Sequence, residues 1–458
     1  MTPDATRSAS RTGTANGRSA RTRTARTRAA ATAAAVTAAL ALTSCAASTT
    51  EEAPAAADTM REEAPEPTDE ETQEMLSSLM PMGTGDPFVD ARTAAAHMPA
   101  TALTLSTGLA AATGTEGDVA SPAADLRAGL TALLQEHVYL AGIAVATAYT
   151  TGADSTEFEA AAAALDGNSV DLSEAIGSLA GEENGATFLE VWRSHIADFV
   201  DYAVARAGDD QEGMDQALAD LAAYTQTAGG FFEEISGGEL PADAIAESLS
   251  MHVTTLTEAI DALAAGDPAA YAELQEAAAH VSASASTIAG GFDTALDLEG
   301  DPNDDAATLR ADLTNLLQEH VYLASIAVFT AYTADGGPES EAFTAAAGVL
   351  DANSVALSEA VTSLAGPENG AAFLDLWREH IGFFVDYAVA AAGDDEQAMQ
   401  EALRNLDGYR PQAGMFFEDV SGGELPADAV AEGLGMHVET LAGAIDSLDA
   451  ALVEGASQ

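Results

Sequence analysis

The chain has 458 residues, with 74 Asp or Glu against 16 Arg and no lysine, and its formal net charge at pH 7 is −58. A surface this acidic repels nucleic acid and anionic lipid, which excludes a nucleic-acid partner, and it attracts cations. Aromatic residues make up only 5% of a chain rich in alanine and leucine, a balance that favours helices over sheets.

Residues 1–44 predict a bacterial lipoprotein signal peptide. Arginines are spread over residues 7–28, and the apolar stretch 29–42 that follows is too short to span a bilayer comfortably. The stretch runs into Leu42-Thr43-Ser44-Cys45, which resembles the lipobox in which the cysteine is lipidated and becomes the mature N-terminus. We therefore expect an exported protein, anchored through Cys45 to the outer face of the cytoplasmic membrane. Cys45 is the only cysteine, so disulfides and thiolate metal sites are excluded.

Residues 45–86 predict a disordered acidic tether. The segment contains the acidic pairs Glu51-Glu52 and Glu62-Glu63 together with several prolines. Such a composition buries too little apolar surface to offset the entropy of ordering a chain, so we expect a solvated linker without a fold of its own.

An internal repeat organises the rest of the chain. Three segments return almost unchanged: 133–141 at 316–324, 199–205 at 384–390, and 236–243 at 421–428. Self-similarity of this kind predicts that the two halves share one supersecondary plan.

Six helices are predicted in the first repeat from apolar spacing, prolines at starts and glycines at stops. They cover about 124–150, 155–179, 183–207, 210–234, 241–264 and 267–296, and the first five recur within 307–452. The missing sixth helix appears at the front, because Ala94-Ala95-Ala96-His97 matches Ala277-Ala278-Ala279-His280, so 87–113 is an extra copy of it.

Two pairings of these helices are open. Short loops favour one bundle over 124–297 and a second over 307–452, completed by the helix at 87–113. The alternative is two local units, 87–264 and 267–452. Either pairing predicts an all-α fold of two related antiparallel helical bundles that arose by internal duplication.

The eight histidines are the candidate functional residues, because each lies near the middle of a different predicted helix and the two sets match. In the preferred pairing, the first bundle holds His137, His195, His252 and His280, and the second holds His320, His380, His437 and His97. Apolar residues three and four positions away place these rings on the core faces of their helices. Midpoints of similar-length helices meet at one height in a bundle, so we expect each set to converge.

A shared cation is the chemistry that this arrangement favours. A buried neutral imidazole needs a partner for each ring nitrogen, and a metal ion relieves that need for several rings at once. Imidazole without thiolate favours copper or zinc. Six residues are candidates for second-shell contacts with the outer nitrogens: Asp201, Asp386, Asn168, Asn353, Tyr139 and Tyr322. Glu136 and Glu319 are weaker ligand candidates, since each is turned about 100° from the adjacent histidine.

Two other interpretations remain open. Duplication preserves any residue, so one alternative is that the histidines are core residues of a structural or interaction module of the envelope that responds to pH. Two facing histidines could instead bind a b-type haem. Pro99 lies two residues after His97 and predicts a kink there, which weakens a site that includes His97.

The histidine motifs carry a resemblance to a known group of proteins. Glu136-His137, Trp192-Arg193-Ser194-His195, Met251-His252 and Ala278-Ala279-His280 resemble an uncharacterised family of exported, histidine-containing helical-bundle proteins from Gram-positive bacteria. Some of its members are associated with copper amine oxidase N-terminal-like proteins. The resemblance implies a helical bundle and export, and it implies no activity.

Sequence motifs of enzymes are absent. The chain has no Gly-rich phosphate loop, no His-Glu-x-x-His and no nucleophile elbow. It also lacks the Asn-Tyr-Asp/Glu-Tyr signature of amine oxidases. We therefore expect a non-enzymatic lipoprotein whose partners are a transition metal cation and, through its anchor, the membrane.

Overall fold

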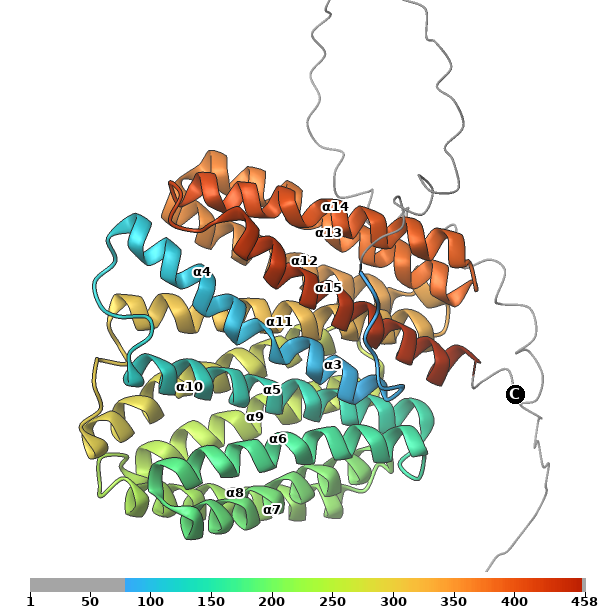
Figure 1. The fold of residues 1–458 in the computed structure, drawn as a ribbon. Coiled ribbons are helices and arrows are strands. Elements are labelled where there is room, and N and C mark those ends of the chain that lie inside the picture. Colours follow the sequence, from blue (N-terminus) through green and yellow to red (C-terminus); the bar gives the residue numbers. More distant parts are fainter. Residues whose placement is uncertain (1–78, 455–458) are drawn as a thin grey trace, which may run out of the picture.

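The computed structural model describes residues 79–454, and every regular element in that range is helical (Figure 1). The prediction of an all-α fold is confirmed. The predicted signal peptide, Cys45 and most of the tether lie outside the described residues. The α-helices are α3 (Pro87–Ala96), α4 (Met98–Thr113), α5 (Pro122–Thr151), α6 (Thr156–Ala180), α7 (Glu182–Ala207), α8 (Gln211–Ile235), α9 (Ala242–Ala265), α10 (Ala270–Leu296), α11 (Asp305–Thr333), α12 (Glu341–Ala365), α13 (Pro367–Ala392), α14 (Glu396–Val420) and α15 (Ala427–Asp449).

Capping residues account for where the helices begin and end. Pro122 opens α5, where a missing N–H breaks no helical hydrogen bond, and the side chain of Ser121 accepts from the N–H of Ala124. Gly266 ends α9 in the left-handed conformation, with φ of 66°, which glycine adopts without steric penalty.

Two sets of helices pack side by side in a layered stack (Figure 1). In the first set, α5 packs against α6 and α10, and α9 lies between α8 and α10. In the second set, α11 packs against α12 and α4, and α15 packs against α14 and α3. The sets meet where α5 lies against α11, and one continuous apolar cluster includes residues of both. The N-terminal pair of helices therefore lies with the C-terminal half of the chain.

The N-terminal helical segment is broken at His97. α3 ends at Ala96 and α4 begins at Met98, with Pro99 as its second residue. Proline has no N–H to donate to the carbonyl of Ala95, and that carbonyl accepts instead from the N–H of His97. The predicted kink is present, and it places His97 at a helix junction instead of mid-helix.

Residues 79–86 differ from the predicted tether, because they pack against α15. Leu79 is buried, and the N–H of Met82 donates to the carbonyl of Glu439 at 2.8 Å. This approach depends on Gly443, where a Cβ would lie only 2.1 Å from the carbonyl oxygen of Met82. Residues 79–86 therefore pack on the bundle ahead of α3, since a glycine on α15 leaves room for their backbone.

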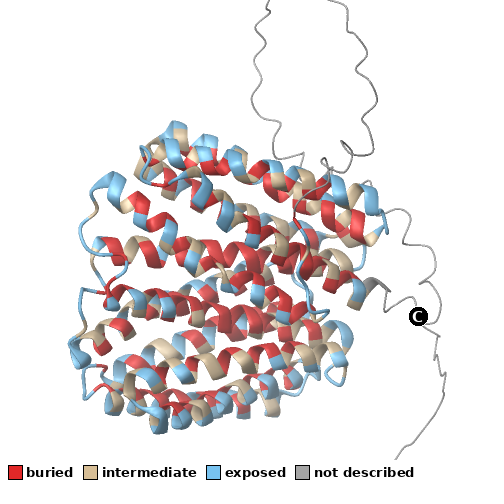
Figure 2. Ribbon diagram, viewed as in Figure 1, coloured by how far each residue is buried: buried red, intermediate tan, exposed pale blue. Residues whose placement is uncertain are grey.

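The helix α5 is long, apolar and largely buried. Among the described residues, α5 alone has the length and composition to cross a membrane, with a mean hydropathy of 1.2 over the relevant window. Within the protein 72% of that window is buried, which is the pattern of an interior helix (Figure 2).

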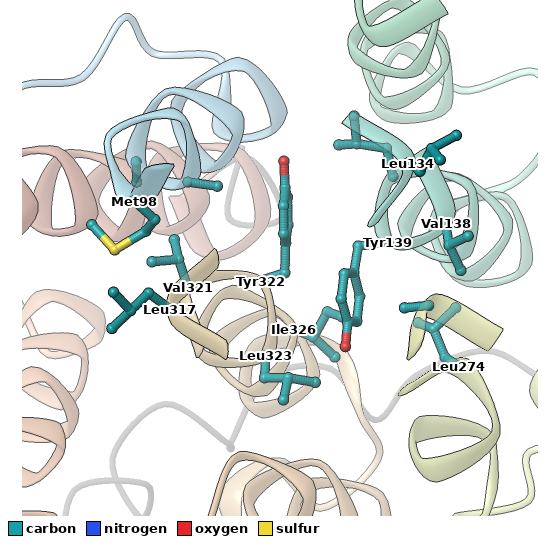
Figure 3. Packing of buried hydrophobic residues seen from close by; sticks show 14 of the residues in the cluster. Met98, Leu134, Val138, Tyr139, Leu274, Leu317, Val321, Tyr322, Leu323 and Ile326 are labelled. Atoms are coloured by element: carbon teal, nitrogen blue, oxygen red, sulfur yellow. The ribbon is translucent and has the colours of Figure 1, made fainter. Parts of the chain in front are cut away.

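A buried polar cluster joins α5 to α11. The rings of Tyr139 and Tyr322 stack with centroids 5.4 Å apart, and their hydroxyls point in opposite directions (Figure 3). The Tyr139 hydroxyl donates to Glu319 at 2.9 Å, and Asn353 donates to the other oxygen of that carboxylate at 2.8 Å. On the opposite side, burial and then the charge of Glu136 raise the pKa of Tyr322. The two sets are thus connected by polar contacts that cross between them.

Arg92 on α3 completes this cluster. Its guanidinium donates to the buried carboxylate of Glu136 on α5 and to Asp171 on α6. Burial raises the pKa of Glu136, and the charge of Arg92 partly offsets that effect. Arg92 therefore supplies a positive charge that partly offsets the burial of this carboxylate, and it ties α3 to the first set.

We expect Arg92→Ala to lower the free energy of unfolding by about 2–4 kcal/mol, because it leaves the Glu136 carboxylate buried without a counter-charge. Urea denaturation measures the change. The matched control is Arg193→Ala, which removes an exposed ion pair with Asp166 and should change stability by less than about 1 kcal/mol. Equal effects of the two substitutions would contradict the role of Arg92.

Candidate metal centre

Three helices of each set present a histidine to one point in the core. In the first set His137 on α5, His195 on α7 and His252 on α9 have 0%, 0% and 3% of their surface exposed. Because these helices are of similar length and each ring lies near the middle, the three rings meet at one level. The arrangement places three imidazoles where water does not reach them.

The first triad, defined as His137, His195 and His252, is close enough to share an ion. The Nε2 atoms of His137 and His195 are 3.4 Å apart. The His252 ring centroid lies 5.8 Å from that of His137 and 6.3 Å from that of His195. One ligand atom from each ring can be chosen so that all three lie within 4.8 Å of one another.

The second triad, His320, His380 and His437, repeats this geometry on α11, α13 and α15. The Nε2 atoms of His320 and His380 are also 3.4 Å apart. The His437 ring centroid lies 6.0 Å from that of His320 and 6.3 Å from that of His380. Its three ligand atoms again lie within 4.8 Å of one another.

Aromatic side chains enclose each triad. Trp192 lies with its ring centroid 4.8 Å from that of His137 and 4.5 Å from that of His195. Tyr224 of α8 stacks on His195 at 4.5 Å. In the second set Trp377 and Tyr409 take the same places. These rings fix the orientations of the imidazoles and keep the local dielectric low.

All six triad histidines are neutral at pH 7. Burial, and then the neighbouring histidines, lower the pKa of His137, His195 and His380 well below 6.5. Burial lowers the pKa of His252 to about 4 and that of His320 to about 3. Burial, followed by the charge of His97, lowers the pKa of His437 to about 4. A neutral imidazole keeps the lone pair that binds a metal.

The outer ring nitrogens have no hydrogen bond of normal geometry. This holds for Nδ1 of every triad histidine, and His252 and His437 also lack a partner for Nε2. Interior polar atoms are rarely left in this state. The six rings are therefore buried at a free-energy cost, and a bound ion would lower that cost only at the one nitrogen of each ring that it binds.

The structure does not place the six predicted second-shell residues beside the histidine nitrogens. Asp201 and Asp386 are exposed on α7 and α13. Asn168 donates to the carbonyl of Leu133, and Asn353 to Leu316 and Glu319, so neither amide contacts a histidine nitrogen. Tyr139 and Tyr322 belong to the polar cluster between α5 and α11. Each of these side chains lies on a helix face turned away from the triads.

His280 and His97 do not join the triads. His280 on α10 is half-buried, and its Nε2 lies 3.1 Å from the carbonyl oxygen of Ser248. His97 is half-buried at the junction of α3 and α4. Both are near enough to lower the pKa of the third triad histidine, His252 or His437. The structure therefore brings together three of each predicted four, with the fourth at the edge.

The triads fit a tetrahedral or trigonal ion better than a haem. Two nitrogens bound at about 2.0–2.1 Å to one tetrahedral ion lie about 3.4 Å apart, which is the separation of the paired Nε2 atoms. The third nitrogen needs to move inward by about 1 Å. Axial haem ligands lie about 4 Å apart with the porphyrin between them, whereas the paired Nε2 atoms are only 3.4 Å apart.

Comparisons with protein-family models, with curated proteins and with solved structures find no match to this chain. Its function is therefore argued from its own residues.

Proposed function

We propose that this chain is an exported, lipid-anchored protein that binds a transition metal ion, copper or zinc, at each of its two histidine triads without catalysing a reaction. The observation that supports this most is the convergence, twice, of three buried neutral imidazoles whose ligand atoms lie within 4.8 Å of one another. Imidazole is a good ligand for both ions, and the absence of thiolates is compatible with an oxidising compartment.

The burial of both triads supports holding an ion rather than activating a substrate, because all six histidines are at most 4% exposed. Three neutral nitrogens bring no negative charge, so the ion keeps its full charge inside an apolar shell of Trp192 and Tyr224 and their counterparts. The surrounding protein, with a net charge of −58, offsets part of that charge at longer range. No carboxylate belongs to either group of ligand atoms within the described residues, so a general base is not at hand. A buffering or delivery role follows from these features.

The alternative function is a structural or interaction module of the envelope in which the histidines only pack. The stacking of Tyr224 on His195 and of Tyr409 on His380 favours it, since aromatic contacts alone can hold an imidazole. That alternative predicts no response to metal ions.

Metal titration of the tag-free full-length chain tests the proposal, with Cys45→Ser to remove the single thiol from consideration. We expect Cu(II) or Zn(II) to bind at two equivalents per chain. At a thousandfold excess over Kd, one site stabilises the folded state by about 4 kcal/mol, which raises Tm by roughly 5 °C for a chain of this size. An unchanged melting curve with every ion, together with no metal retained after dialysis, supports the alternative.

A further inference from the structure

A cavity of about 300 Å³ lies beside the first triad. Its inner wall is apolar and includes Leu130, Leu172 and Phe188, with Trp192 and His252 at the end nearest the triad. Ser248 of α9 and Ser284 and Thr287 of α10 also line it, and the exposure of Thr287 places this side nearest the solvent. The cavity shares His252 with the first triad, and its other lining residues lie outside that triad.

The second set contains the same cavity at equivalent positions. Its volume is about 210 Å³, and its wall includes Leu313, Leu357, Phe373, Trp377 and His437. Several wall residues differ in size or branching between the sets and remain apolar: Ile176 corresponds to Val361, Ile245 to Val430, and Ile288 to Leu105. The space persists although the side chains around it have changed, which is not expected of an accidental packing defect.

The polar groups of each cavity lie at its outer end. His252 and His437 line the cavities, but their ring nitrogens are enclosed by the protein and do not face the space. The half-buried His280 and His97 line the outer ends, together with Ser248 and Ser284 in the first cavity and Thr101 and Thr104 in the second. An occupant therefore meets an apolar cavity body and hydrogen-bonding side chains at the outer end.

We propose that each cavity binds a small, uncharged, mostly apolar molecule with one hydrogen-bonding group, such as a phenol or a short alcohol. Dry apolar cavities of about 150 Å³ already bind benzene-sized molecules, so both volumes suffice. Anions are disfavoured by the acidic chain and by the apolar wall. This ligand site does not depend on a bound metal, and it adds a second kind of ligand to the function proposed above.

The two tryptophans report on the two cavities, because Trp192 and Trp377 are the only ones in the chain and each lines one cavity. Tryptophan fluorescence of the chelator-treated protein is titrated with trichloroethanol, an apolar quencher with one hydroxyl, and with trichloroethane, which lacks it. Acrylamide serves as the polar quencher. We expect saturable quenching by trichloroethanol at lower concentration than by trichloroethane, and weak quenching by acrylamide.

Variants locate the binding in the second cavity. In a Trp192→Phe background, Gly433→Leu at the mouth and Val361→Phe in the wall should each weaken trichloroethanol binding about fivefold or more, the effect of overfilling a packed space. Gly348→Leu, at an exposed position of α12, is the matched control and should leave it unchanged.

Quenching that rises linearly, as for a free tryptophan derivative, overturns the proposal. So does saturable quenching that neither filling substitution alters. Because the protein is metal-free in these titrations, failure of metal binding and failure of this proposal are distinguishable.

Discussion

Replacing His252 and His437 with leucine is expected to stabilise the metal-free protein and to abolish its stabilisation by copper or zinc. Both ring nitrogens of each histidine are buried without partners, a state that costs about 1–3 kcal/mol per group, whereas leucine fills a similar volume without polar atoms. Calorimetric melting of the double variant, with and without metal, measures both effects. The larger of these two effects is the loss of the stabilisation by metal, about 4 kcal/mol per site.

The same comparison separates the metal site from the structural alternative. His280→Leu is the control, because His280 lies outside the first triad and should leave the metal-dependent rise in Tm in place. If the double variant is instead destabilised in the absence of metal, and keeps its response to metal, the histidines are packing residues and the proposed function is wrong.

Stability should fall steeply as the pH decreases from 6.5 toward 4. The pKa of His252 and His437 is about 4 in the folded protein and that of His320 is about 3, against 6.5 for an unperturbed imidazole. Between these values the unfolded chain binds protons that the folded chain excludes, so acid favours unfolding. Each such histidine removes about 1.4 kcal/mol per pH unit below 6.5.

Buried carboxylates change stability in the opposite direction as the pH falls, so their effect has to be separated from that of the histidines. Burial raises the pKa of Glu136 and Asp446, so protonation of these groups stabilises the folded state as the pH falls. The histidine effect should dominate above about pH 5, where most carboxylates remain ionised. Thermal melts across this range should show a shallower slope for the His252→Leu, His437→Leu variant. A slope identical to that of the unmodified protein would falsify the assignment of acid sensitivity to the triads.

Helical spacing predicted which face each histidine occupies, but it could not predict which rings would meet. The apolar neighbours of His137, His195 and His252 place them inward, and the structure brings them together. His280 has similar neighbours, yet its ring nitrogen lies beside the Ser248 carbonyl of the adjacent helix. Convergence depends on the rotation of each helix about its axis and on local hydrogen bonds, neither of which periodicity fixes.

The polar cluster was missed although part of its signal is in the sequence. Glu136 and Tyr139 are three residues apart on α5, so they share a face, and the same is true of Glu319 and Tyr322 on α11. That spacing indicates a second buried face opposite the histidines. The contribution of Arg92 had no such signal, because it depends on how α3 packs across the two sets. The cavities likewise follow from packed volumes that no one-dimensional pattern contains.

The placement of α3 and α4 beside α15 has a consequence for biosynthesis. α3 and α4 leave the ribosome before the helices on which they pack, α15 for α3 and α11 for α4, whereas α5 to α10 contact one another and can assemble as they emerge. Until α11 and α15 have been made, the apolar sides of α3 and α4 stay uncovered and prone to aggregation. A chain that ends before α11 should therefore keep a folded set of α5 to α10, whereas α3 and α4 remain unpacked and accessible to proteases.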